Sequence, residues 1–265
     1  MFRICVACLV ASHWLFGSMA CASVPETALR AYRTGAYERA AEVSQSEGSA
    51  ASFAFAAQAI IADAISRKDG YCTPCLAKAE QLAERAISLD PHLIDGYLQS
   101  AVAVGFRGRS IGLSEARAEG LAEQAKDRLD KAMAIDPTNV WARASLGAWN
   151  IEIVHHAGKI LASLMYGASQ SEGLSLYRAA LNDAPAIAVL HFHYALSILS
   201  LDQDEFRAEA ERELRHTLSI SVDDALTRHV QSQASTVLNA MPTCSPRELG
   251  EMVSRLQGYP AGQLD

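Results

Sequence analysis

The sequence predicts an all-α fold, an α-solenoid of antiparallel helix pairs with insertions. The main observation is a spaced pattern that occurs three times: a small residue stands twelve positions before a proline, and an alanine stands five positions before it. Apolar residues make up 50% of the chain and aromatic residues only 7%, and alanine is abundant, which favours tightly packed helices over a β-sandwich. No segment carries the pattern typical of a strand.

The repeated pattern describes a helix that packs closely against its neighbours and then ends. Its copies run over residues 79–91, 125–137 and 173–185. Small residues allow two helices to approach each other, and the closing proline ends the helix at or before the preceding residue. Stacked units of this kind bury a core that no single unit could bury.

The N-terminus has the pattern of a secretory signal peptide, residues 1–22. Arg3 supplies a positive charge, residues 4–16 are mostly apolar, and Ala20-Cys21-Ala22 forms a cleavage site. We therefore expect an exported protein, periplasmic or secreted, with no membrane span after signal removal. A buried first helix, a membrane anchor and a lipid anchor attached at Cys21 are the alternatives.

The first half of the repeat domain, residues 23–240, begins with helices over 28–34 and 36–47. A strongly apolar helix follows over 49–67. Thr73 as cap and Pro74 at the first helical position begin the next helix, which ends before Pro91. Its partner is expected over 93–106.

The second half begins with a long helix over 114–135, capped by Ser114. Further helices are expected over 140–154, 172–182, 187–199, 205–220 and 223–240, the last as a capping helix. In residues 205–220 the pattern occurs a fourth time, with Val222 in place of the proline. Pro, Gly and Cys become frequent from residue 241, so 241–265 is expected to be a short helix, 246–256, and a loose tail.

Gly35, Tyr37 and Ala40 have the spacing of a helix–turn–helix join. Together with the Asp-Pro helix ends before Thr138 and His92, and with Leu146-Gly147 in a following helix, they resemble the tetratricopeptide repeat family. The resemblance covers residues 26–240 and implies a binding module. The successive prolines are 46 and 48 residues apart, against about 34 in the standard repeat. The extra residues are expected as insertions at 107–113 and 155–170.

A narrower resemblance rests on residues 136–139, on Leu146-Gly147-Ala148-Trp149, and on the extended segment that ends at Tyr166-Gly167. These residues are similar to the bacterial relatives of the regulator of microtubule dynamics family. The resemblance covers residues 80–240. It implies a divergent tetratricopeptide fold and no particular reaction.

Cys72 and Cys75 form the most specific chemical motif, a Cys-x-x-Cys pair at the start of a helix. In an oxidising compartment such a pair forms a structural disulfide. The alternative is a dithiol oxidoreductase, because a helix N-terminus lowers a thiol pKa. Redox motifs of this type normally follow a strand, so we favour the structural bridge. Cys244 then has no partner.

The candidate partner-binding residues lie on two predicted helices. Trp141 and Trp149 share one face of helix 140–154, and Phe192 occupies a comparable place one repeat later. Arg143 and Glu152 are candidates for polar contacts beside them. Core packing against the neighbouring repeat is the alternative for these aromatic residues.

Two histidine pairs are poor candidates for a metal site. His155 and His156 are adjacent, and His191 and His193 are two apart, so neither pair shares a helix face. We expect no metal and no cofactor. Gly-rich phosphate loops and HExxH are absent from the sequence, and we expect no enzymatic activity.

Net charge and motifs together limit the function. The chain carries a net charge of −7 and no basic cluster, which disfavours nucleic-acid binding. The leading expectation is a scaffold or adaptor that binds a protein or peptide in the cell envelope. The first alternative is a ligand-binding or transport-accessory protein with an enclosed apolar pocket near Leu161 and Tyr166. The second is thiol–disulfide exchange at Cys72 and Cys75. The oligomeric state is left open.

Overall fold

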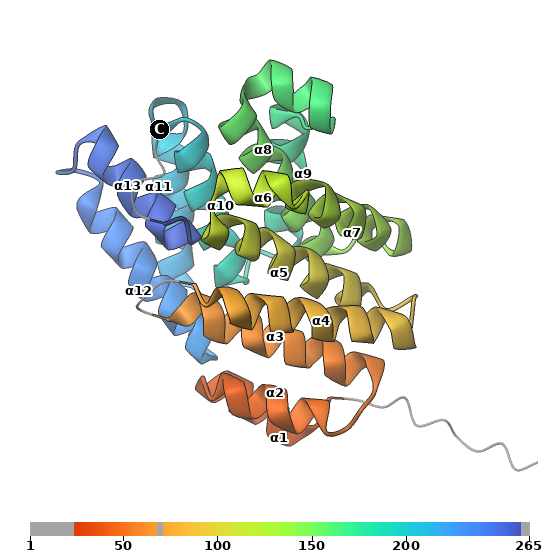
Figure 1. The fold of residues 1–265 in the computed structure, drawn as a ribbon. Coiled ribbons are helices and arrows are strands. Elements are labelled where there is room, and N and C mark those ends of the chain that lie inside the picture. The colour runs from red at the N-terminus through yellow and green to blue at the C-terminus, as the bar shows by residue number, and fades with distance from the viewer. Residues whose placement is uncertain (1–23, 68–70, 261–265) are drawn as a thin grey trace, which may run out of the picture.

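The computed structural model describes residues 24–67 and 71–260, and every regular element in these ranges is a helix (Figure 1). The predicted signal peptide lies outside the described residues. No helix in the described ranges is both long enough and apolar enough to cross a membrane. The helices are α1 (Glu26–Thr34), α2 (Tyr37–Gln45), α3 (Ala50–Ser66), α4 (Thr73–Leu89), α5 (Ile94–Ile111), α6 (Leu113–Ala118), α7 (Leu121–Ile135), α8 (Val140–Tyr166), α9 (Gln170–Asp183), α10 (Ala188–Leu201), α11 (Gln203–Ser219), α12 (Ala225–Ala240) and α13 (Pro246–Gln257).

Five helices form an inner layer that closes into a ring. α3 contacts α5, α5 contacts α8, α8 contacts α10 and α10 contacts α12. α12 returns to contact α3 and α1, so the last repeat meets the first (Figure 1). The helices α4, α7, α9 and α11 pack outside this ring. The all-α solenoid prediction is confirmed, and its closure into a ring is a feature that the pattern did not predict.

The small residues of the repeated pattern lie where helices approach most closely. Ala79, Ala132 and Ala180 are fully buried. α8 and α9 cross closely, because a Cβ added to Gly147 would stand 2.8 Å from the carbonyl oxygen of Gly173. Only glycine fits at such a crossing.

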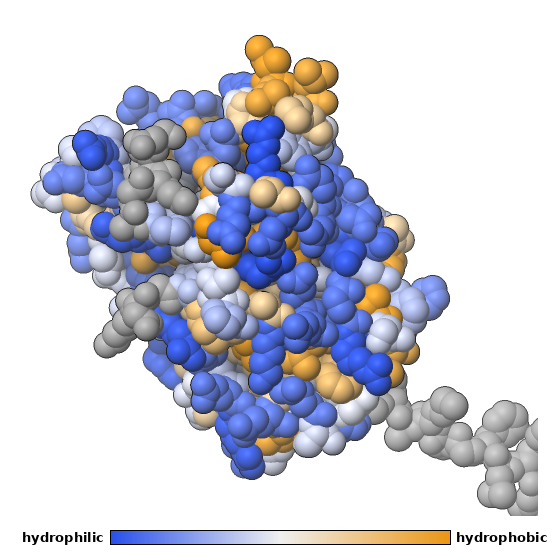
Figure 2. Space-filling view, in the orientation of Figure 1, coloured by the Kyte–Doolittle hydropathy of each residue, from blue (hydrophilic) through white to orange (hydrophobic). Residues whose placement is uncertain are grey.

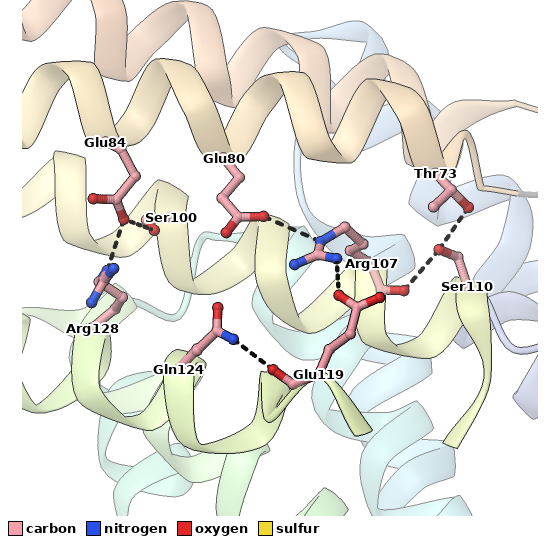
Figure 3. Close-up of polar contacts among 9 residues, drawn as sticks. All are labelled: Thr73, Glu80, Glu84, Ser100, Arg107, Ser110, Glu119, Gln124 and Arg128. Atoms are coloured by element: carbon pink, nitrogen blue, oxygen red, sulfur yellow. Dashed lines mark hydrogen bonds and ion pairs between the residues drawn. The ribbon is translucent and has the colours of Figure 1, made fainter. Parts of the chain in front are cut away.

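Polar contacts join α4, α5 and α7 (Figure 3). Glu84 of α4 accepts hydrogen bonds from Ser100 of α5 and Arg128 of α7, both at 2.8 Å. Nearby, the Arg107 guanidinium lies 3.2 Å from Glu80. These partly buried contacts hold α4, α5 and α7 in register.

Both predicted insertions are largely helical. α5 continues to Ile111, because Gly108 is buried against Leu121 and does not break the helix. The helix predicted over 114–135 is instead interrupted at Gly120, whose φ is 66°, and divides into α6 and α7. The segment 155–170 extends α8 to Tyr166 across a bend at Gly158, whose φ is 73°.

The C-terminal segment is packed as far as Tyr259, where the sequence predicts a loose tail. α13 contacts α10 and α12, and Tyr259 is only 8% exposed. Gly258 has a φ of 95°, and a Cβ there would stand 2.3 Å from the ring of Tyr71. The Tyr71 hydroxyl donates to the Leu256 carbonyl at 2.9 Å, which ties the tail to the start of α4.

Candidate functional site

The ring of inner helices surrounds a half-open cavity of about 330 Å³, which we call the central cavity. Every inner helix contributes to its wall, and so do α1 and α13. Its apolar wall includes Ile61 and Ile65 of α3, Leu98 and Val102 of α5, Trp149 of α8 and Val189 of α10. The volume lies at the lower end of the range for small-molecule sites, about 300–1,000 Å³.

The two tryptophans of α8 hold different places along this cavity. Trp141 lies on the first turn of α8, lines the cavity and is 40% exposed. Trp149 lies two turns further in and is buried. Its indole N–H donates to the Ala122 carbonyl at 2.9 Å, which fixes the ring against α7. Trp141 is therefore open to solvent, and Trp149 forms part of the rigid wall.

A neutral histidine faces the cavity from α10. Burial, with the nearby charges of Arg109 and His229, lowers the pKa of His193 to about 3. The ring packs beside Phe106 and Phe192. A neutral imidazole offers one hydrogen-bond donor and one acceptor, so His193 can bind a polar group without requiring that the group be charged.

Arg109 and Glu152 form an ion pair that joins α5 to α8. The Arg109 Nε donates to Glu152 at 2.8 Å, and a second hydrogen bond makes the contact bidentate. Burial by itself would raise the pKa of Glu152, but Arg109 and the hydrogen bonds to the carboxylate outweigh it and lower that pKa to about 2. Glu152 is therefore ionised across the physiological range.

The C-terminal segment completes this cluster. The Tyr259 hydroxyl donates to Glu152 at 2.5 Å and lies 2.7 Å from the Nε2 of His156. Because the hydroxyl hydrogen points to the carboxylate, the Nε2 of His156 must donate to the hydroxyl oxygen. Tyr259, which follows α13, is thus hydrogen-bonded to the ion pair.

A second cavity of about 300 Å³, the side chamber, lies between α5, α7 and the bent end of α8. Leu161, Met165 and Tyr166 line it. Two of them, Leu161 and Tyr166, are the residues near which the sequence predicts the pocket of a ligand-binding protein. The side chamber and the central cavity share a wall made of Gly105, Arg109, Ala125, Trp149 and Glu152. The ion pair therefore stands between the two spaces.

Gly105 is the one residue of this shared wall that has no side chain. A Cβ built on Gly105 would have no heavy atom within 4 Å. Gly105 sits in the middle of α5, where glycine costs a helix about 1 kcal/mol relative to alanine. Because Gly105 lines both cavities and a Cβ there meets no neighbour, a larger residue at this position would occupy space in the shared wall.

Two of the predicted partner-binding residues lie away from the cavities. Arg143 forms an ion pair with Asp183 at 2.5 Å and donates to the Thr138 carbonyl at 2.8 Å, so it joins α8 to the end of α9. Phe192 is fully buried in the C-terminal core and is not a surface residue. Core packing, the alternative reading of the aromatic residues, describes Phe192.

Cys72 and Cys75 form a disulfide bond at the start of α4. The pair packs against the hydrophobic core of the N-terminal helices, and the Cys75 N–H donates to the Cys72 sulfur. Cys244, half-buried beside the C-terminal core, is the free cysteine of the described residues. In the same ranges no group of three or more His, Cys, Asp or Glu side chains is placed to hold a metal.

The sequence predicts no role for Gly105 or Arg109, and it presents His193 only as one of a histidine pair unsuited to a metal. It ended the second helix of that repeat at residue 106 and so placed Arg109 in an insertion. A signal was available, because Val102, Gly105 and Arg109 follow one another at helical spacing and share one face of α5.

No family model matches the chain, and no curated protein matches it. The tetratricopeptide resemblance accordingly stays a prediction.

Proposed function

We propose that this protein binds a small amphipathic molecule in the central cavity and acts as a ligand-binding or transport-accessory protein, without catalysis. The observation that carries the proposal is the closure of the inner helices around a largely apolar space of about 330 Å³. A peptide-binding solenoid needs an open concave groove. Here α12 contacts α3 and α1, and this contact closes the groove into a ring.

The lining indicates the class of ligand. Aliphatic and aromatic side chains make most of the wall and suit a hydrocarbon or aromatic body. His193, Gln99 and Ser145 provide separate neutral hydrogen-bonding groups, and burial raises the pKa of the Asp95 carboxyl, which also lines the cavity. Arg109 is already neutralised by Glu152, so it does not provide a free cation for an anionic ligand. We therefore expect an apolar body with a neutral polar end.

The predicted signal peptide makes export part of the same proposal. An exported ligand-binding protein would act in the periplasm or outside the cell, where the Cys72–Cys75 bond is stable. The alternative is that the protein is anchored to a membrane through a lipid on Cys21.

The test is titration with N-phenyl-1-naphthylamine, an apolar aromatic amine whose fluorescence rises on leaving water. We expect saturable binding that the Gly105→Leu variant weakens at least tenfold, because leucine fills the space between the cavities. The matched control is Ala134→Leu, which adds the same bulk on the exposed side of α7. Binding that is equal in the two variants would contradict the proposal.

The scaffold function remains a second candidate because of Trp141. This residue is a large aromatic side chain, 40% exposed at the wall of the cavity, and tryptophan is common at protein-binding hot spots. A Trp141→Ala variant that loses a crosslinked protein partner but still binds N-phenyl-1-naphthylamine would support the scaffold function.

A further inference from the structure

The bent end of α8 carries a group of exposed apolar residues, which we call the apolar tip: Ile160, Leu161, Leu164 and Met165. Ile160 is 86% exposed and Leu164 is 81% exposed, more than any other large apolar residues of the described chain. Figure 2 shows apolar atoms projecting from the surface at this end of α8. A patch of this kind marks an interaction site.

The amphipathic pattern of the tip is inverted. Ala162 is fully buried against the body of the protein, while Ile160 and Leu164, one turn apart, share the opposite face. A helix that served only to cover the core would place its large apolar residues inward and polar residues outward. The inverted order indicates that the outward face has a partner.

Gly158 directs the tip away from the protein. Its φ of 73° and ψ of 156° belong to a region that only glycine adopts readily. A Cβ there would meet nothing within 4 Å, so glycine is required by the backbone and not by crowding. Gly167, with a φ of 66°, ends the segment and returns the chain to the body. The tip is therefore a short projecting elbow between two glycines.

The charge around the tip differs from the charge of the whole chain. Residues 153–171 contain one lysine, Lys159, and no acidic residue, in a chain with a net charge of −7. Lys159 is exposed beside Ile160. Arg117 and Glu123, which face the tip across the side chamber, cancel each other in charge. The tip thus has a weakly positive margin and suits an anionic surface.

The area of the tip is small for a protein interface. Four aliphatic side chains of this exposure offer at most about 500 Å². A standard interface buries about 800 Å² on each partner, so the tip alone would not hold a stable dimer. Insertion of a few apolar side chains below lipid headgroups needs no matching surface, since the bilayer adapts to a projecting elbow.

We propose that the apolar tip inserts into the surface of a lipid bilayer, with Ile160 and Leu164 below the headgroups and Lys159 beside anionic lipid. The side chamber, which Leu161 and Met165 line, would then open next to the membrane.

Flotation with vesicles tests this proposal. The protein is purified as the cell processes it, with Cys21→Ser in every variant so that no lipid chain can be attached there. It is mixed with vesicles of phosphatidylcholine alone or with 30% phosphatidylglycerol. We expect binding that is stronger with phosphatidylglycerol, and an Ile160→Gln/Leu164→Gln variant that binds at least tenfold more weakly. Lys159→Gln should remove the preference for phosphatidylglycerol.

The matched control is Leu89→Gln/Leu218→Gln, which changes two exposed leucines at the ends of α4 and α11. It should bind vesicles like the parent, and circular dichroism should show that both double variants are folded. Absence of binding to either vesicle, or equal binding by both double variants, would overturn the proposal. A dimer or a captured protein that depends on Ile160 and Leu164, without vesicle binding, would instead assign the tip to a protein partner.

Discussion

Arg109 of α5 and Glu152 of α8 form a bidentate ion pair in the wall between the central cavity and the side chamber. Their positions are 43 residues apart in the chain, and the pair crosses from one repeat to the next. Glu152 also accepts from Tyr259, so a single carboxylate connects α5, α8 and the C-terminal segment. The contact joins two inner helices and lies in the wall of both cavities.

The first prediction concerns the stability of this ion pair. Arg109→Met leaves the Glu152 carboxylate buried without its cation, and we expect the free energy of unfolding to fall by about 3–5 kcal/mol. The double variant Arg109→Met/Glu152→Leu removes both charges and should regain most of the loss. Urea denaturation measures both values. A single variant as stable as the parent would show that the pair is not needed.

A second prediction concerns two glycines with opposite surroundings. Gly147→Ala should lower the free energy of unfolding by about 1–3 kcal/mol, because its methyl group would stand 2.8 Å from the Gly173 carbonyl oxygen. Gly105→Ala should raise that free energy by up to about 1 kcal/mol, because it improves helix propensity in open space. Thermal unfolding of the two variants gives the comparison, and changes of the same sign would contradict it.

The third prediction concerns pH. Folded His193 has a pKa of about 3, below its value of about 6.5 in the unfolded chain, so the unfolded state binds the extra proton between these values. Stability from neutral His193 is therefore present above pH 6.5 and is lost as pH falls toward 3. His193→Gln should reduce the slope of stability against pH by up to about 1.4 kcal/mol per pH unit between pH 6 and 4. Urea melts across this range measure the slope, and parallel curves would refute the assignment.

The fourth prediction concerns the disulfide bond. The Cys72–Cys75 bond closes a very short loop, so the Cys72→Ser/Cys75→Ser variant should lose only about 2 kcal/mol of stability. A structural bridge should also resist reduction and should not reduce a test disulfide. An insulin-reduction assay checks this point, and turnover there would favour the thiol-exchange alternative.

The sequence predicted the helices well wherever a local signal marked their ends. Proline closes the pattern after α4, α7 and α9, and each of these helices ends two residues before it. The alanines of the pattern are buried, because their spacing places them on one face of the helix and that face packs against its neighbours. Such signals depend only on residues close together in the chain, so they can be recognised in a single sequence.

The features that the sequence did not predict depend on contacts distant in the chain. Gly108 looks like a helix breaker, but its burial against Leu121 lets α5 continue and brings Arg109 to the cavity. The contact between α12 and α1 joins segments nearly 200 residues apart, and no local pattern encodes it. The candidate site is therefore less predictable than the fold, since the cavity exists only when the ring closes.

The central claim is that the ring holds a small amphipathic molecule, and native mass spectrometry of the gently purified protein tests it most directly. The account predicts a retained molecule with an apolar body and a neutral polar end, present in the parent and in Ala134→Leu. The same molecule should be reduced at least tenfold in Gly105→Leu. Retention at the same level in Gly105→Leu would place the ligand elsewhere and contradict the account.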